Sequence, residues 1–161
     1  MRPPRLMIRL MGRAHAAIYR RSGGARLSSF GAAPVLLLTT TGRRTGKERT
    51  VPLLYVKDGE AFAIVGSMGG HDSHPAWVHN LRARPQATVQ VGDQVIAVNA
   101  READPDEVAR LWLKLVEMYP AYADYRARTS RRFPVVLLMP GEPRLGGVRL
   151  ASRAPYPPLP P

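Results

Sequence analysis

Residues 35–67 read VLLLTTTGRRTGKERTVPLLYVKDGEAFAIVGS, and this stretch decides the fold. Apolar runs of strand length alternate here with turn signals, which predicts strands over 35–41, 49–56 and 61–67. A glycine-framed turn separates the first two strands, and Asp58-Gly59 lies at the centre of a typical hairpin turn before the third. The stretch therefore predicts two consecutive antiparallel hairpins.

The segments on either side extend this pattern. A further hairpin is expected from strands over 86–91 and 94–101, and a last strand over 134–139. Helices are expected over 5–21, from Pro75 to about residue 83, and from the Asp104 cap onward. Six short strands with a few interposed helices predict an α+β fold, a six-stranded and mainly antiparallel β-barrel.

Net charge is unevenly distributed along the 161 residues. The chain has 24 basic and 12 acidic side chains, a formal charge of +12, and residues 1–30 contribute seven arginines without any acid. We expect a basic N-terminal arm (1–30), a barrel domain (31–140) and a disordered tail rich in proline and glycine (141–161). Because residues 31–140 are nearly neutral, the barrel is not expected to bind nucleic acid specifically.

The absence of cysteine excludes disulfides and thiolate chemistry, and no apolar run approaches the roughly 20 residues of a membrane span. Helix 5–21 is amphipathic, with Met7, Met11, Ala14 and Ile18 on one face and arginines opposite. Two placements of this helix remain open. It packs on the barrel, or it lies on an anionic membrane surface.

Residues 39–47 combine hydroxyls, two glycines and three cations. Such a turn can bind an anion through backbone N–H groups and guanidiniums, while an ordinary exposed hairpin tip is the alternative. It is not a Walker P-loop, because only three residues separate the glycines and Glu48 follows Lys47.

The segment 66–70 ends the third predicted strand. Val65 stands where a hydrolase nucleophile elbow needs glycine, so Ser67 is not expected to be such a nucleophile. The glycines there favour close approach of a ligand to the backbone, or simply form a loop. His71, His74 and His79 match no zinc spacing, and we expect no metal site.

Aromatic residues supply the remaining candidates. Trp77 and Asn80 share one helical face, although core packing would also explain the tryptophan. Tyr119, Tyr122 and Tyr125 recur at three-residue spacing around Pro120. They would line an aromatic pocket with polar tips, or form a packed helix corner.

Taken in order, these motifs resemble the deazaflavin-dependent nitroreductase family over about residues 33–140. The motifs are Thr-Thr-Gly-Arg-Arg-Thr-Gly at 40–46, Val51-Pro52-Leu53, Ser67-x-Gly69-Gly70, His74-Pro75-x-Trp77-x-x-Asn80-Leu81, Tyr119-Pro120-x-Tyr122-x-x-Tyr125 and Thr129-x-Arg131-x-x-Pro134-Val135-Val136.

The resemblance implies a split β-barrel that uses the reduced deazaflavin coenzyme F420 as hydride donor. It implies coenzyme contacts from Arg43, Arg44, Thr45, Pro52, Leu53, Leu54, Gly66, Ser67, Met68, Ala76, Trp77, Asn80 and Tyr122. It places Ser67, Tyr119, Tyr122 and Tyr125 on the substrate side.

The expected reaction is hydride transfer to an electron-poor acceptor such as a quinone, an activated alkene (enone) or a nitroaromatic. We expect a cytoplasmic monomer, with peripheral contact to the inner face of the cell membrane through residues 5–21. Two alternatives remain. One is an oxidoreductase on a similar barrel that uses flavin mononucleotide, and the other is a non-enzymatic basic protein that binds membrane or nucleic acid.

Overall fold

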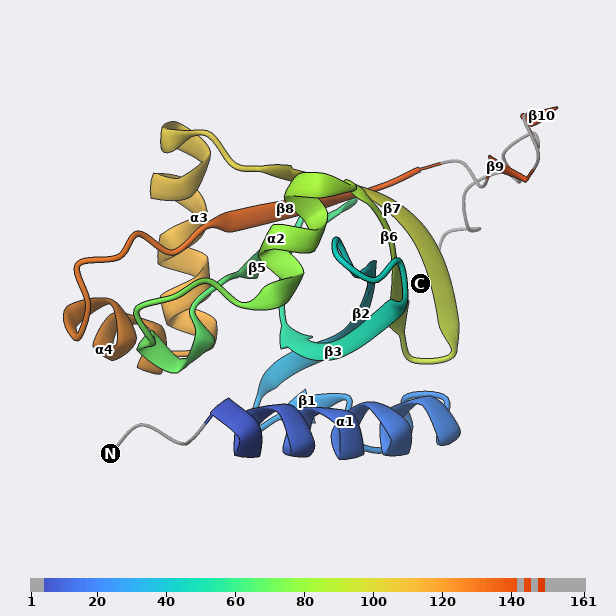
Figure 1. Cartoon of the computed structure of the whole chain (residues 1–161). Helices are drawn as coiled ribbons and strands as arrows, with labels where there is room; N and C mark the ends of the chain where they lie inside the picture. The colour runs from blue at the N-terminus through green and yellow to red at the C-terminus, as the bar shows by residue number, and fades with distance from the viewer. Residues whose placement is uncertain (1–4, 142–143, 146–147, 150–161) are drawn as a thin grey trace, which may run out of the picture.

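The structure is a computed structural model that describes residues 5–141, 144–145 and 148–149 (Figure 1). One antiparallel sheet of eight strands dominates it, in the order β1-β2-β6-β7-β8-β5-β4, with β3 also paired to β2. The strands are β1 (Ser29–Phe30), β2 (Ala33–Thr41), β3 (Glu48–Leu54), β4 (Val56–Asp58), β5 (Ala61–Val65), β6 (Gln86–Val91), β7 (Gln94–Glu102) and β8 (Val135–Pro140).

All six predicted strands are present within two residues of their predicted bounds, but the strand count is wrong. The predicted strand 49–56 divides at Tyr55 into β3, which pairs with β2, and β4, which pairs with β5. The two-residue strand β1 was not predicted. Because β3 and β4 lie at opposite ends of the strand order yet are separated by one residue, the sheet has to curl into a half-barrel (Figure 1).

Four α-helices surround the sheet, and they are α1 (Arg5–Arg21), α2 (Ala76–Ala83), α3 (Pro105–Met118) and α4 (Ala121–Ala127). Pro75 is the N-cap of α2 rather than its first helical residue, since its ψ of 152° is extended. Tyr122 and Tyr125 lie on the helix α4, which was not among the three predicted helices. Pro120 prevents α3 from continuing and is itself the N-cap of the next helix, α4.

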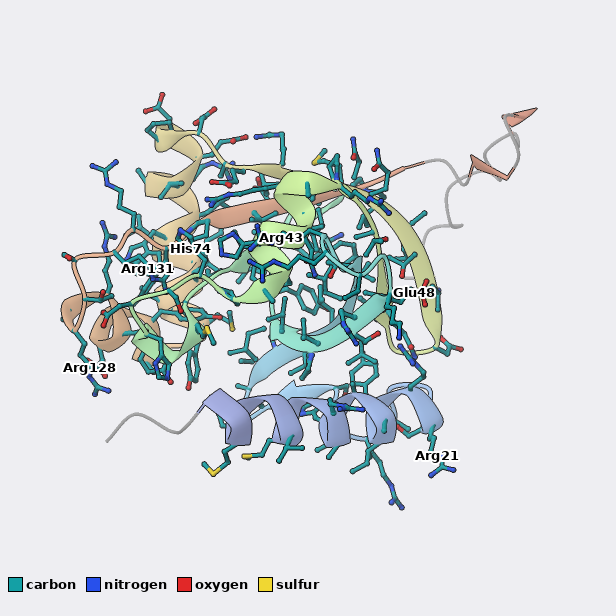
Figure 2. The ribbon with its side chains drawn as sticks, viewed as in Figure 1. Arg21, Arg43, Glu48, His74, Arg128 and Arg131 are labelled. Atoms are coloured by element: carbon teal, nitrogen blue, oxygen red, sulfur yellow. The ribbon has the colours of Figure 1, made fainter. Side chains whose placement is uncertain are left out.

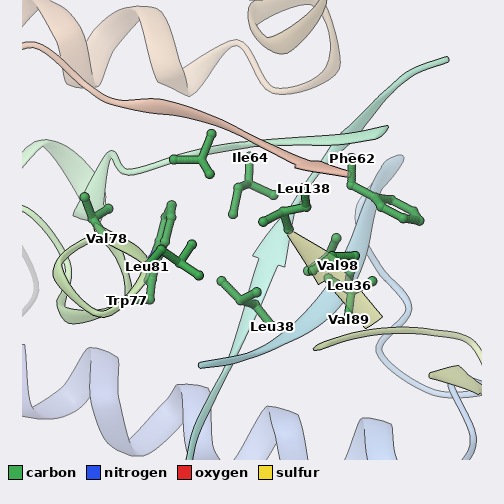
Figure 3. Close-up of a cluster of buried hydrophobic side chains, with 11 residues drawn as sticks. Leu36, Leu38, Phe62, Ile64, Trp77, Val78, Leu81, Val89, Val98 and Leu138 are labelled. Atoms are coloured by element: carbon green, nitrogen blue, oxygen red, sulfur yellow. The ribbon is translucent and has the colours of Figure 1, made fainter. Parts of the chain in front are cut away.

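Alternation along the strands builds two main cores, and a third, smaller cluster of buried residues lies under α1. Phe62 and Ile64 face the barrel interior, which α2 closes with Trp77, Val78 and Leu81 (Figure 3). Ala61, Ala63 and Val65 point to the other face of β5, which α3 and α4 cover. This central strand is therefore buried on both sides.

Helix α1 packs along the outside of the sheet, next to β3 (Figure 1). Its anchor is the fully buried Tyr19, whose hydroxyl donates to Val35 O (3.2 Å) and accepts from Gly92 N (2.9 Å). Gly24 lies so close to Gly92 that a Cβ there would stand 2.3 Å from the Gly92 Cα. These contacts show that α1 packs on the barrel.

The packed face of α1 is not its apolar face. Four large apolar side chains stay exposed, with exposed fractions of 47% for Met7, 57% for Leu10, 64% for Met11 and 45% for Ile18. Ile18 and Tyr19 point about 100° apart on the helix, so a helix anchored by Tyr19 turns this stripe away from the sheet. Within the described residues, no helix combines the length and apolarity needed to cross a membrane.

The predicted disordered tail lies mostly outside the described residues. Of that segment past Gly141, the structure describes two short strands, β9 (Arg144–Leu145) and β10 (Val148–Arg149), which pair with each other. The division into arm, barrel and tail stays a prediction.

Candidate active site

The turn between β2 and β3 is a closed loop that exposes two guanidiniums. Gly42 N donates to Lys47 O (2.8 Å) and Gly46 N donates to Gly42 O (2.7 Å), while Gly46 has a φ of +68°. Arg43 and Arg44 are exposed, and no salt bridge joins either to an acidic side chain of the described residues. Thr45 accepts from Lys47 N (3.3 Å) and so shapes the same loop.

Asn80 ties this turn to helix α2. The buried Asn80 accepts from Arg43 N at Oδ1 (3.1 Å) and donates from Nδ2 to Thr40 Oγ1 (3.0 Å). Both polar atoms of the Asn80 amide bond to protein groups. Asn80 therefore contributes to anion binding in the turn by fixing the position of Arg43.

Electrostatics around the turn are strongly positive. His79 lies on α2 near Arg43, and its pKa is lowered by burial and then by the charges of Arg43, Arg82 and Arg44. The lowered pKa indicates that positive charge gathers at this turn, and such a concentration of positive charge favours the binding of an anion.

The segment after β5 forms a tight turn with three consecutive residues in the left-handed region. Their φ angles are +47° at Met68, +61° at Gly69 and +77° at Gly70. Met68 is the unusual member, because left-handed backbone disfavours side chains. Gly66 has to lack a side chain, since a Cβ there would stand 2.8 Å from Pro134 Cγ.

Ser67 opens this turn and is 8% exposed. Its carbonyl accepts from Gly70 N (3.0 Å). The turn also packs on α4, since a Cβ at Gly70 would lie 3.1 Å from Tyr125 O. The chain thus brings Ser67 and the tyrosine-bearing helix to one place.

The three tyrosines form one aromatic cluster. Ring centroids are 5.1 Å apart for Tyr119 and Tyr122, 6.2 Å for Tyr119 and Tyr125, and 6.4 Å for Tyr122 and Tyr125. The Tyr119 and Tyr125 hydroxyls lie 3.2 Å apart. Burial, then this hydrogen bond, raises the pKa of Tyr119 to about 12, and burial also raises the pKa of Tyr122. These two phenols are therefore neutral donors at physiological pH.

The other predicted contacts vary in accessibility. Trp77 is in the interior core, 4% exposed, as the packing alternative required, whereas Ala76 is exposed at the start of α2. On β3, Leu53 packs against the interior core. Leu54 packs against the two buried clusters outside the barrel, one under α3 and α4 and the other under α1. Pro52 lies under α1, because a Cβ at Gly12 would stand 3.6 Å from Pro52 Cδ.

Two side chains at the site were not singled out from the sequence. Phe30 is 62% exposed and meets the Tyr119 ring edge-on, with centroids 6.1 Å apart. A large aromatic side chain that stays exposed beside the tyrosine cluster is the feature that draws attention to it. Arg131 contacts the segment after β5, as Figure 2 shows near His74. Its only sequence signal was the Thr-x-Arg-x-x-Pro motif.

Two hollows of about 310 and 200 Å³ lie elsewhere, on the outer face of β2, β3 and β6. Thr39, Glu48 and Thr88 border both. Ser67 and the tyrosines border neither, so we do not place the reaction there.

Fold and site together define a class of protein with a curled antiparallel sheet, an exposed cationic turn tied to α2, and a glycine-rich turn that packs on an aromatic cluster. These groups suit a planar coenzyme with an anionic tail. A sequence model of the F420H(2)-dependent quinone reductase family matches residues 10–140, and the chain belongs to that family.

Individual relatives agree. The chain is 44% identical over 131 residues to an F420H(2)-dependent quinone reductase of Mycobacterium tuberculosis, covering 78% of this chain and 87% of that protein. It is similar to a solved F420-H2 dependent reductase (TM-score 0.61, 42% identity, 65% and 93% coverage). A solved relative described as a domain-swapped dimer gives a TM-score of 0.64 at 36% identity, with 78% and 94% coverage.

Family membership confirms the predicted class of enzyme. The chain is an oxidoreductase of the F420-dependent type, its coenzyme is F420, and quinone-type acceptors are those of its family. The roles of individual residues stay predictions.

Proposed function

We propose that the chain transfers hydride from reduced F420 to a quinone at the place where the Ser67–Gly70 turn meets the tyrosine cluster, with the curled sheet as a split β-barrel. One observation carries the proposal. Helix α2 connects the cationic turn, through Asn80 and Arg43, to the segment that begins at Ser67. An elongated coenzyme could therefore bind its anionic tail and its ring to parts of one rigid unit.

Arg43 and Arg44 hold the anionic tail by charge-assisted hydrogen bonds, and Thr45 keeps the turn in shape. The residues Gly66, Ser67, Met68 and Ala76 border the ring, Leu53 and Leu54 contribute from β3, and Trp77 and Asn80 support it from behind. When bound, reduced F420 supplies the hydride. The protein orients the acceptor and excludes water.

The acceptor binds against the aromatic cluster. Ser67 donates a hydrogen bond to the coenzyme or to the oxygen of the acceptor that gains charge. Tyr119 and Tyr125 present linked hydroxyls, of which one donates a proton, whereas Tyr122 is 5% exposed and chiefly holds the cluster together. Enones and nitroaromatics are the other acceptors to test.

We further propose that the enzyme is cytoplasmic and lies peripherally on the inner face of the membrane. The apolar stripe of α1 remains exposed beside exposed arginines such as Arg13 and Arg21. A lipid-soluble quinone would then be taken up at the surface where it resides.

The coenzyme site is tested by the double variant Arg43→Ala/Arg44→Ala. We expect its dissociation constant for reduced F420 to rise at least about tenfold, because each charge-assisted hydrogen bond is worth about 1.5–3 kcal/mol. The exposed pair Arg21→Ala/Arg26→Ala is the matched control and should bind normally. Unchanged affinity in the first variant would remove the cationic turn from the site, and a yellow purified protein would favour flavin mononucleotide.

A further inference from the structure

All three guanidinium nitrogens of Arg131 bond to one neighbouring segment. Nε donates to His71 O (2.9 Å), Nη1 donates to Gly66 O (3.0 Å) and Nη2 donates to Ser67 O (2.8 Å). Nη1 also lies 2.8 Å from His74 Nδ1. All four acceptors belong to residues 66–74, which connect β5 to α2, so one side chain spans the base of that connection (Figure 2).

The position of Arg131 is itself fixed. Its guanidinium lies over the Phe133 ring, 4.7 Å from the centroid, and its backbone N donates to Thr129 Oγ1 (3.2 Å). Thr129 Oγ1 in turn donates to Asp72 Oδ1 (3.0 Å). The segment before β8 and the segment after β5 are thus joined at several points.

The segment that Arg131 holds has only one short turn of regular structure, Met68–Gly70, with hydrogen bonds from Gly70 N to Ser67 O (3.0 Å) and from His71 N to Met68 O (3.2 Å). Three consecutive residues, 68–70, have positive φ, and Met68 adopts it with a side chain. The glycines adopt positive φ readily, whereas such backbone at Met68 persists only where surrounding contacts determine it. Bonds to the carbonyls of Gly66 and Ser67 fix the entrance to the turn, and the bond to His71 fixes its exit.

The same contact decides which tautomer His74 adopts. A guanidinium has donors and no acceptor, so the Nδ1 atom of His74 has to accept and the ring proton lies on Nε2. Burial and the nearby Arg131 charge lower the pKa of His74, which favours the neutral ring. The His74 ring meets the His79 ring edge-on at 5.9 Å, which continues the contact toward α2.

We propose that Arg131 is a positioning residue for hydride transfer: it holds the Ser67–Gly70 turn in its left-handed shape and fixes His74 as the neutral Nε2–H tautomer. The role in hydride transfer rests on the proposed function, because Arg131 acts through Ser67 and the turn beside the coenzyme. The tautomer does not rest on it.

The tautomer is tested on the coenzyme-free protein by ¹⁵N NMR of the histidine rings at pH 7.5, with His74 assigned by the loss of its signals in His74→Gln. We expect an unprotonated Nδ1 and a protonated Nε2 in the wild type. A proton on Nδ1, or a charged ring, would overturn the tautomer assignment.

Positioning is tested by single-turnover oxidation of bound reduced F420 by menadione in Arg131→Lys and Arg131→Met. We expect the rate to fall at least about tenfold in the methionine variant and by less in the lysine variant, which keeps some donors, because small misplacements of reacting groups are costly. The menadione concentration that gives half the maximal rate should change little, since the hydrogen bonds of the Arg131 guanidinium go to residues 66–74 and not to the tyrosines. The exposed neighbour Arg132→Met is the matched control and should behave as wild type.

The lysine variant guards against simple unfolding. A folded Arg131→Lys protein with wild-type rate, wild-type coenzyme affinity and no change of the His74 tautomer would overturn the positioning role. Wild-type protein that does not bind F420 would overturn the proposed function instead, and the NMR measurement would still decide the tautomer.

Discussion

Asn80, Thr40 and Ser67 are buried polar side chains of the barrel, and two of them bond to each other. In the part of the chain that the structure describes, every buried side-chain nitrogen or oxygen has a hydrogen-bond partner. A buried polar pair that also holds Arg43 N connects core stability to the geometry of the cationic turn, which is the proposed site of the coenzyme tail.

At the scale of this residue, Asn80→Ala should lower the free energy of unfolding by about 1–3 kcal/mol, because Thr40 and Arg43 N lose their partner. It should also weaken F420 binding, since the cationic turn loses its tie to α2. Urea unfolding and coenzyme titration measure the two effects. Asn99→Ala, at an exposed position of β7, should change neither, and a stable Asn80→Ala protein would contradict the bridging role.

Tyr119 gives a second prediction at this scale, from its raised pKa of about 12. The folded state keeps the phenol proton more tightly than the unfolded state, whose tyrosines ionise near pH 10. The stabilising effect is therefore complete below pH 10 and is lost as the pH rises toward 12. Unfolding free energies measured from pH 9 to 11.5 should fall more steeply in wild type than in Tyr119→Phe, and parallel curves would disprove this.

At the scale of elements, α3 shows a complete capping box. The Asp104 carboxylate accepts from Glu107 N (2.9 Å), and Glu107 accepts from Asp104 N (3.0 Å) and from both Nη atoms of Arg101 (2.7 Å each). Local chemistry alone fixes this helix start, which explains why the sequence predicted it correctly.

These contacts make part of the stability pH-dependent. The hydrogen bond from Arg101, and then that from Asp104 N, lowers the pKa of Glu107 from 4.5 to about 2. A lowered pKa in the folded state stabilises the protein above pH 4.5, and this effect is lost as the pH falls toward 2. Glu107→Gln should therefore flatten the acid limb of stability against pH, while the exposed control Glu117→Gln should not.

At the scale of the whole molecule, the exposed stripe on α1 gathers four large apolar side chains on one surface. Met7, Leu10, Met11 and Ile18 are each more than two-fifths exposed on a helix already anchored by its other side. This arrangement leaves the stripe available for a second contact without loosening the barrel.

We expect full-length protein to float with anionic liposomes and Leu10→Gln/Met11→Gln to remain in solution, because the variant loses apolar area while keeping every arginine. Leu113→Gln, at a 73% exposed leucine on α3, is the matched control. Equal flotation of all three proteins would reject membrane contact through α1. A stripe covered by a second copy would appear instead as a dimer in sedimentation, against the predicted monomer.

The sequence by itself determined the six main strands, three of the four helices and the start of α3, because turn chemistry, capping and periodicity act over a few neighbouring residues. It also indicated the cationic turn and the tyrosine cluster, whose members lie close in the chain. Only tertiary structure decided the break at Tyr55, the buried state of Trp77 and Tyr122, and the face on which α1 packs. The four contacts of Arg131 lie 57–65 residues away in sequence, and no local pattern encodes such distances. They arise because β5 and β8 pair in the sheet, which brings the segments beside them together.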